Sequence, residues 1–291
     1  MRRRDLLSGV LAAAGVAAAS ATEFEPCINQ QTMLSTPFEA ACEAWAAAGF
    51  KRVELWFPKL SQAGIPADTA SAVLRKRGLT PVCACSSDAR LTATKDEFSQ
   101  GLFEMRKWLE YGQELGLRSY VIYSQSVARP GGEDHKLAAG RLGQVAEMAE
   151  RHHIRLALEF FAGSNLLGCL PTTLGVLRAA GHTNVGVCLD AFHFFVGSSK
   201  TEDLDDLRPG NIAHVHFHDV PAAIPRERLV DADRLPPGEG RLRLDRITAA
   251  LRRIEYRGPL SVELFGAQFH DGDPKQVAAR CFRAVRRYTL A

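Results

Sequence analysis

The sequence predicts a single-domain (β/α)8 TIM barrel that follows a short N-terminal signal segment. Eight strand-like segments are each followed by a helical stretch, and such strict alternation implies a parallel sheet with helices packed outside it. The chain has 291 residues, which suits eight such units, because a closed barrel of this type takes about 250 residues. An open, doubly wound sheet is the alternative. No Gly-x-Gly-x-x-Gly turn follows an early strand, so dinucleotide binding by such a sheet is disfavoured.

The predicted strands are short runs rich in β-branched, aromatic and small apolar residues. They cover residues 24–32, 51–57, 80–86, 118–124, 154–161, 185–192, 212–219 and 259–265. The predicted helices have apolar side chains at helical spacing, and several stop at a glycine. They cover residues 35–49, 66–78, 94–115, 133–153, 171–180, 243–256 and 274–288. A short acidic segment at 201–207 precedes the seventh strand, and the long irregular segment 220–240 follows it.

Residues 1–21 are predicted to be a twin-arginine export signal that is not part of the fold. Three arginines near the start precede a weakly apolar, alanine-rich run over 10–18, and Ala19-Ser-Ala21 offers a small-residue cleavage site. The apolar run is too short to span a membrane, so no stable membrane anchor is expected. The barrel would then be residues 22–291, located in a bacterial periplasm. The alternative is an alanine-rich helix on a cytoplasmic protein.

Composition excludes several classes of protein. Hydrophobic residues make up 46% and charged residues 24%, as in an ordinary globular domain. The net charge of +3 is small, and the arginines are scattered without a lysine-rich tract, so nucleic acid is not an expected partner. The seven cysteines have irregular spacings, and several lie in apolar strands, which predicts buried small hydrophobes without a disulfide framework.

The seventh predicted strand contains three histidines. Side chains alternate faces along a strand, so His214, His216 and His218 share one face. Imidazoles carry polar nitrogens that need partners when buried, so this face cannot be an ordinary apolar core. Metal coordination and hydrogen bonding to carboxylates are the two interpretations.

Acidic residues stand at the ends of three other predicted strands. In a barrel the carboxyl ends of all strands converge on one opening, which would bring four side chains together on strands five to eight. These are Glu159, Asp190, His216 and Glu263. Three carboxylates and one imidazole suit a single divalent ion such as Mn²⁺, Co²⁺ or Mg²⁺, and Zn²⁺ is also compatible. Without a cation, three buried acids would repel one another and be driven toward protonation.

Further residues are candidates for the same opening. His193, three residues after the sixth-strand aspartate, is close enough to reach substrate, and His218 and Trp56 are further candidates for substrate contact. Each of them also has a structural alternative, as a strand-end, rim or core residue. His214 lies deeper in the strand, so an indirect role beneath the ligands is favoured. Glu54 would need a cation or hydrogen-bond donor if it points inward, and the sequence does not identify that partner.

The motifs that carry these residues resemble the xylose isomerase-like TIM-barrel superfamily, in its sugar phosphate isomerase/epimerase branch. The motifs are Leu-Glu-Phe-Phe, Cys-Leu-Asp-Ala-Phe-His, Ile-Ala-His-Val-His, Pro-Gly-Glu-Gly and Leu-Ser-Val-Glu-Leu-Phe. The resemblance covers essentially the whole chain after the signal. It implies the metal site named above, with Glu159 and Glu263 as the proton-transfer pair and His193 in substrate binding. It also implies a substrate-binding arginine, for which Arg226, Arg228, Arg234 and Arg241 compete.

Two features depart from parts of that superfamily. The endonuclease branch carries extra histidines on strands two to four for a three-metal cluster. Here those strand ends read Leu-Trp-Phe-Pro, Cys-Ala-Cys-Ser and Ile-Tyr-Ser-Gln, which argues against DNA repair. Phosphorylated sugars are cytoplasmic, so an export signal favours an unphosphorylated sugar, cyclitol or keto acid.

The predicted function is a divalent-metal-dependent isomerase or epimerase of a sugar or related polyhydroxy ketone. Proton removal beside a carbonyl would give an enediolate, and Glu159 and Glu263 would move the proton. One alternative is a dehydratase acting on a cyclitol or keto acid such as inosose or dehydroshikimate. Another is a non-catalytic sugar-binding barrel, which would not need two acids on opposite faces of its ligand. Whether the chain forms a homo-oligomer is left open.

Overall fold

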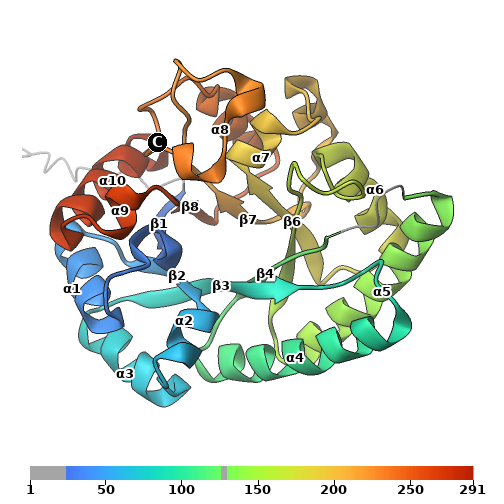
Figure 1. Ribbon diagram of the computed structural model, residues 1–291, viewed down its shortest axis with the longest axis horizontal. Helices are drawn as coiled ribbons and strands as arrows, with labels where there is room; N and C mark the ends of the chain where they lie inside the picture. Colours follow the sequence, from blue (N-terminus) through green and yellow to red (C-terminus); the bar gives the residue numbers. More distant parts are fainter. Residues whose placement is uncertain (1–23, 126–129, 291) are drawn as a thin grey trace, which may run out of the picture.

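A computed structural model describes residues 24–125 and 130–290, and it shows a closed barrel of eight parallel strands in chain order (Figure 1). The strands are β1 (Glu25–Asn29), β2 (Arg52–Trp56), β3 (Thr80–Asp88), β4 (Ser119–Tyr123), β5 (Arg155–Glu159), β6 (Val185–Asp190), β7 (Ile212–His216) and β8 (Pro259–Val262). Closure comes from parallel pairing of β1 with β8. The predicted (β/α)8 barrel is therefore confirmed, and the open-sheet alternative is wrong. The predicted signal at 1–21 lies outside the described residues.

The seven predicted helices are present and surround the strands (Figure 1). They are α1 (Phe38–Ala48), α3 (Ala67–Lys76), α4 (Lys95–Glu114), α5 (Gly132–Arg151), α6 (Leu170–Ala180), α8 (Leu244–Arg253) and α10 (Pro274–Thr289). Local chemistry sets their ends. Thr94 and Glu97 form a reciprocal capping box at the start of α4. Gly49 ends α1 in the left-handed conformation, with φ of 109°, which glycine adopts without steric cost.

Several short helices were not predicted. They are α2 (Phe57–Gln62), α7 (Ala191–Val196), α9 (Ala267–His270) and four 3-10 turns, η1 (Gln30–Met33), η2 (Thr201–Asp206), η3 (Arg226–Arg228) and η4 (Asp231–Asp233). One or two turns are too short to show helical periodicity in a sequence. Seven predicted strands were too long, those for β1, β2, β4, β5, β6, β7 and β8. Short helices account for three of them, because β1, β2 and β6 pass directly into η1, α2 and α7.

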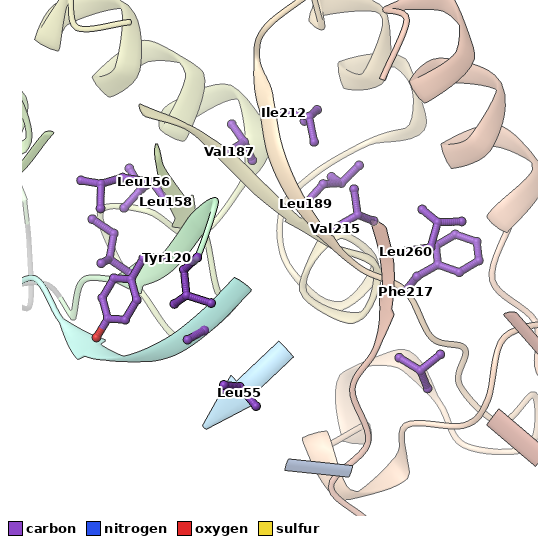
Figure 2. Close-up of a cluster of buried hydrophobic side chains, with 14 of the residues drawn as sticks. Leu55, Tyr120, Leu156, Leu158, Val187, Leu189, Ile212, Val215, Phe217 and Leu260 are labelled. Atoms are coloured by element: carbon purple, nitrogen blue, oxygen red, sulfur yellow. The ribbon is translucent and has the colours of Figure 1, made fainter. Parts of the chain in front are cut away.

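Two sets of buried side chains alternate along the strands. One set packs against the surrounding helices, and Figure 2 shows part of it, including Leu55, Tyr120, Leu158 and Val187. The other set lies on the opposite faces and fills the barrel interior with small side chains. Its members are Cys27, Val82, Cys83, Cys85, Val121, Ala157 and Cys188. All seven cysteines of the chain are free, and six of them are buried, as predicted.

The alternation explains where polar groups can reach the opening. Glu159 and Asp190 lie two residues beyond Ala157 and Cys188, so their side chains also point inward from β5 and β6. They lie at the carboxyl ends of these strands, beyond the small apolar side chains that fill the barrel interior. In the part of the chain that the structure describes, no helix is long and apolar enough to cross a membrane.

Candidate metal centre and active site

The four predicted ligands converge at the carboxyl ends of neighbouring strands. Glu159, Asp190 and His216 are the last residues of β5, β6 and β7, and Glu263 directly follows β8. One ligand atom from each of the four lies within 4.8 Å of the others. Barrel closure causes this convergence, because it places all eight carboxyl ends around one opening.

The Nδ1 atom of His216 is at the centre of the group. It lies 2.8 Å from Glu159 Oε1, 3.3 Å from Glu263 Oε2 and 3.5 Å from Asp190 Oδ2. His216, Asp190 and Glu263 are buried, whereas Glu159 is partly exposed toward the opening. The arrangement has one ring nitrogen facing three carboxylates, with solvent access on the Glu159 side.

Burial and charge act in opposite directions on these acids. Burial raises the pKa of Glu263 to about 8, and the nearby carboxylates of Glu159 and Glu54 add to that rise, although His216 and Arg234 oppose it. Burial would also raise the pKa of Asp190, but the guanidinium of Arg234 and the imidazoles of His218, His193 and His216 together outweigh it and hold that pKa well below its usual range. The pKa of His216 is well above its usual range despite burial, because acidic groups surround the ring.

This donor set fits a divalent cation. Carboxylate oxygens and a neutral imidazole are the ligands that Mn²⁺, Co²⁺ and Zn²⁺ accept, and a cation would offset both the burial and the neighbouring carboxylates that raise the pKa of Glu263. The thiol of Cys188 lies 3.7 Å from His216 Nδ1, but burial raises its pKa far above neutrality, so a thiolate ligand is disfavoured there.

The structure selects one of the four candidate arginines. Arg234 is almost fully buried, and its Nη1 donates to Asp190 Oδ2 at 2.9 Å and to Glu263 Oε2 at 2.7 Å. Its guanidinium lies between the rings of Phe192 and Phe265, 4.9 and 4.8 Å from their centroids. The other arginines do not reach the acids. Arg226 and Arg241 stack on Phe195, and Arg228 is exposed in η3.

The connection between β7 and α8 holds Arg234 in place. Asp219 is buried, and its backbone pairs with that of Leu235 through two hydrogen bonds of 2.8 Å. Its carboxylate accepts three further backbone N–H groups, from Val220, Gly238 and Leu242. The long segment 220–240 is therefore folded back onto the strand end, which delivers Arg234 from a loop to the opening.

His193 borders the opening, whereas Trp56 packs against the barrel interior. His193 is partly exposed, and Arg234 Nη2 donates to its Nε2 at 3.3 Å, so it borders the same opening. Trp56 is partly buried and packs on the small side chains of the barrel interior. That position is compatible with both predicted roles, a pocket wall and core packing. Substrate binding by these residues stays a prediction.

His218 lies away from the rim position considered for it. Its side chain is 0% exposed, and its Nε2 accepts the backbone N–H of Phe192 at 2.9 Å, at the start of α7. Burial lowers the pKa of His218 to about 4, so the ring is neutral at ordinary pH. The structure therefore places His218 against the start of α7, with its Nε2 3.4 Å from Asp190 Oδ1. Contact of His218 with a substrate stays a prediction.

Several polar contacts at the opening were missed by sequence reasoning. The side-chain amides of Asn29 and Gln31 donate to Glu263 Oε1 at 3.0 and 3.1 Å. Asn29 lies two residues beyond the inward-facing Cys27 on β1, so the rule that identified the acidic strand ends would have found it, whereas Gln31 belongs to η1, which was not predicted. Glu54, which had no assigned partner, hydrogen-bonds to both His214 and His216.

Comparison with known proteins gives the family. A model of the xylose isomerase-like TIM barrel matches residues 42–287. The chain belongs to this family. An inosose isomerase of Halalkalibacterium halodurans is 32% identical over 133 residues, covering 44% of the chain and 46% of that protein. The inosose isomerase of Bacillus subtilis is 27% identical over 192 residues, covering 64% and 66%.

Other relatives carry different names. A 3-dehydroshikimate dehydratase of Pseudomonas putida is 26% identical over 261 residues, covering 87% of the chain and 40% of that protein. The chain thus spans less than two thirds of each of these three relatives. Among solved structures, the IOLI protein with a bound zinc atom superposes with a TM-score of 0.84 at 21% identity, covering 91% of the chain and 98% of that protein. An L-ribulose 3-epimerase gives 0.75 at 19%, covering 91% and 94%. At these identities the superpositions show the shared fold.

Proposed function

We propose that the protein is a divalent-metal-dependent isomerase or epimerase of a small sugar or related polyhydroxy ketone. One observation carries the proposal. Glu159 ends β5 and Glu263 directly follows β8, yet both carboxylates face the same ring nitrogen of His216. Two acids directed at one point from different strands can reach different sides of a substrate, as proton transfer beside a carbonyl requires. The inosose isomerases and the L-ribulose 3-epimerase among the similar proteins support this class of reaction.

Glu159, Asp190, His216 and Glu263 would hold the ion. When bound, it would supply Lewis-acid polarisation of the substrate carbonyl. The bound zinc in the similar IOLI structure is consistent with a divalent ion, and the identity of the metal stays a prediction of Mn, Co, Mg or Zn.

The two glutamates would have different roles in proton transfer. Glu263 is buried and restrained by Asn29, Gln31 and Arg234, so it would act from a fixed position. Glu159 is partly exposed, and His216 is its hydrogen-bond partner, so it would be freer to follow a proton between neighbouring carbons. Arg234 and His193 would orient substrate oxygens, and Trp56 would form an apolar wall.

A lyase on the same site is the second candidate. The 3-dehydroshikimate dehydratase of Pseudomonas putida matches 87% of this chain, more than either inosose isomerase described above. The same proton abstraction followed by loss of a β-hydroxyl gives dehydration, so the site residues would be shared. A non-catalytic sugar-binding barrel is disfavoured, because binding alone would not require both glutamates. We also propose that the protein is exported by the predicted signal at 1–21, and that its substrate is unphosphorylated.

Exchange with heavy water tests the proton pair. The wild type, screened with ketoses, cyclitols and keto acids, should wash deuterium into the carbon beside the carbonyl. Glu159→Gln and Glu263→Gln should each lower turnover by about 10²- to 10⁴-fold, the usual worth of a positioned general base. Glu147→Gln, on the exposed face of α5, is the matched control and should be unaffected. An unsaturated product would identify a lyase. Normal turnover by both site variants on a substrate that the wild type accepts would contradict the proposal.

Metal binding is tested separately from activity. The purified chain should bind about one divalent ion, as a mononuclear site of this kind requires. His216→Ala should weaken binding by more than about 100-fold, since loss of an outer hydrogen-bond partner alone costs about 10- to 100-fold. His182→Ala, remote from the four ligands, should leave the affinity unchanged. Full occupancy in the His216→Ala protein would exclude this ligand set.

A further inference from the structure

Glu54 is a fully buried carboxylate beneath the candidate metal centre. It belongs to β2, and its contacts reach strands β7 and β8. Its Oε1 lies 3.0 Å from His216 Nε2, and its Oε2 lies 2.9 Å from His214 Nε2. Ser261 Oγ donates to Oε2 at 2.6 Å. Three donors from two other strands are thus directed at the two oxygens of one carboxylate.

This contact determines which nitrogen of His216 can face a cation. A neutral imidazole has one N–H and one lone pair, and a metal takes the lone pair. A carboxylate that receives three donors acts as an acceptor, so it places the ring proton of His216 on Nε2. When an ion replaces the second ring proton, the lone pair is then on Nδ1, which is the atom 2.8 Å from Glu159 and 3.3 Å from Glu263.

We propose that Glu54 is a positioning residue of the metal centre, which fixes the tautomer and the ring orientation of His216. His214 and Ser261 hold the second oxygen of Glu54 and thereby prevent the carboxylate from rotating away. Metal-binding histidines commonly donate their other ring N–H to such a partner, which also makes the ligating nitrogen more basic. The inference rests on the proposed metal centre. In this role Glu54 orients a metal ligand and does not contact the substrate.

A competing arrangement uses the same residues differently. Glu54, His214 and His216 each offer an atom within 4.8 Å of the others, so they could hold a second ion. Both carboxylate–imidazole distances are ordinary for hydrogen bonds, and the short Ser261 contact occupies Oε2 as well. Hydrogen bonding therefore accounts for every contact of Glu54 without an ion.

Zinc titration distinguishes these arrangements. Zn²⁺ affinity is measured by chelator competition on the full chain, for the wild type, Glu54→Gln, Glu54→Leu and Ser261→Ala. Glu54→Leu should weaken binding by about 10- to 100-fold, and Glu54→Gln by less, because one amide oxygen can still accept from one imidazole. Ser261→Ala removes one restraint on Glu54 but leaves both imidazole contacts, so it should weaken binding by less than Glu54→Leu does. Glu147→Gln, on the exposed face of α5, is the control, and its affinity should equal that of the wild type.

Each other outcome has a definite meaning. Equal affinity in the wild type and both Glu54 variants would overturn the positioning role while leaving the metal centre intact. Two zinc ions in the wild type and one in Glu54→Leu would show that Glu54 is itself a ligand. Absence of zinc binding by the wild type would contradict the metal centre and the inference together.

A measurement on the wild type covers the case in which the Glu54 variants do not fold. In the zinc-loaded chain with ¹⁵N-labelled histidine, NMR should show a slowly exchanging, hydrogen-bonded proton on Nε2 of His216 and zinc on Nδ1. Zinc on Nε2, or a proton on Nδ1, would overturn the inference irrespective of any variant.

Discussion

Three histidines of one short segment have three different environments. Burial would lower the pKa of His214, but the nearby Cys83 and Glu54 raise it to about 9. His216 lies between Glu54 on one ring nitrogen and the three acids on the other. His218 has a pKa lowered to about 4 by burial. The same side chain at two-residue spacing therefore serves as a charged partner, a candidate ligand and a neutral core group.

The neutral state of His218 predicts an acid-sensitive fold. Its pKa is about 4 in the folded chain against 6.5 in the unfolded chain, so the unfolded chain binds more protons between these values. The contribution of His218 to the free energy of unfolding should be largest above pH 6.5 and fall by at most about 3 kcal/mol as the pH drops toward 4. Glu263 and His214, whose pKa values are raised to about 8 and about 9, contribute with the opposite sign. The His218 contribution is therefore isolated by urea unfolding of the wild type and a His218 variant at pH 7.5 and 5.0, with chelator present.

His218→Gln provides the comparison for that measurement. Glutamine can accept the Phe192 N–H but does not titrate, so the loss of stability between pH 7.5 and 5.0 should be smaller in the variant than in the wild type. An equal loss in both proteins would show that other groups carry the acid sensitivity.

At the scale of elements, the connection between β7 and α8 packs closely against the residues that follow β7. A Cβ atom at Gly240 would overlap with the carbonyl oxygen of Val220 and with the carboxylate of Asp219. Gly240→Ala should therefore displace the loop and cost about 1–3 kcal/mol, the usual cost of overpacking. Denaturant unfolding measures the cost, and hydrogen exchange should show weaker protection over residues 225–241.

Gly140 is the control for Gly240. It lies in the exposed face of α5, and a Cβ atom there would meet nothing within 4 Å. Gly140→Ala should stabilise the protein by about 0.5–1 kcal/mol, because alanine loses less backbone entropy in a helix. If both substitutions had the same effect, the close approach at Gly240 would not constrain the loop.

At the scale of the whole molecule, export is the open question for residues 1–21. Replacing Arg3 and Arg4 together by lysine should trap the precursor in the cytoplasm, because the twin-arginine receptor reads the guanidinium pair. Fractionation with an antibody to the barrel checks this outcome. Periplasmic appearance at the wild-type level would show that the segment has another role.

The closed barrel explains why the four residues of the candidate metal centre could be grouped from the sequence. Once eight alternating strands and helices are recognised, closure brings every carboxyl end to one opening. The proximity of Glu159, Asp190, His216 and Glu263 could therefore be predicted without knowledge of any tertiary contact. The long helices could also be predicted from sequence, because glycines and capping residues mark their ends locally. The ends of the strands were harder to predict, because η1, α2 and α7, which directly follow β1, β2 and β6, are too short to show a helical period.

The sequence by itself determined the fold class, the inward face of each strand and the four residues that meet at the opening. Each of these follows from local periodicity and from the geometry of a closed barrel. Only the tertiary structure decided that Arg234 reaches the acids, that His218 is buried and that Glu54 faces two histidines. These contacts join residues far apart in the chain, and they depend on the path of a loop or on distance across the barrel, which no local pattern encodes.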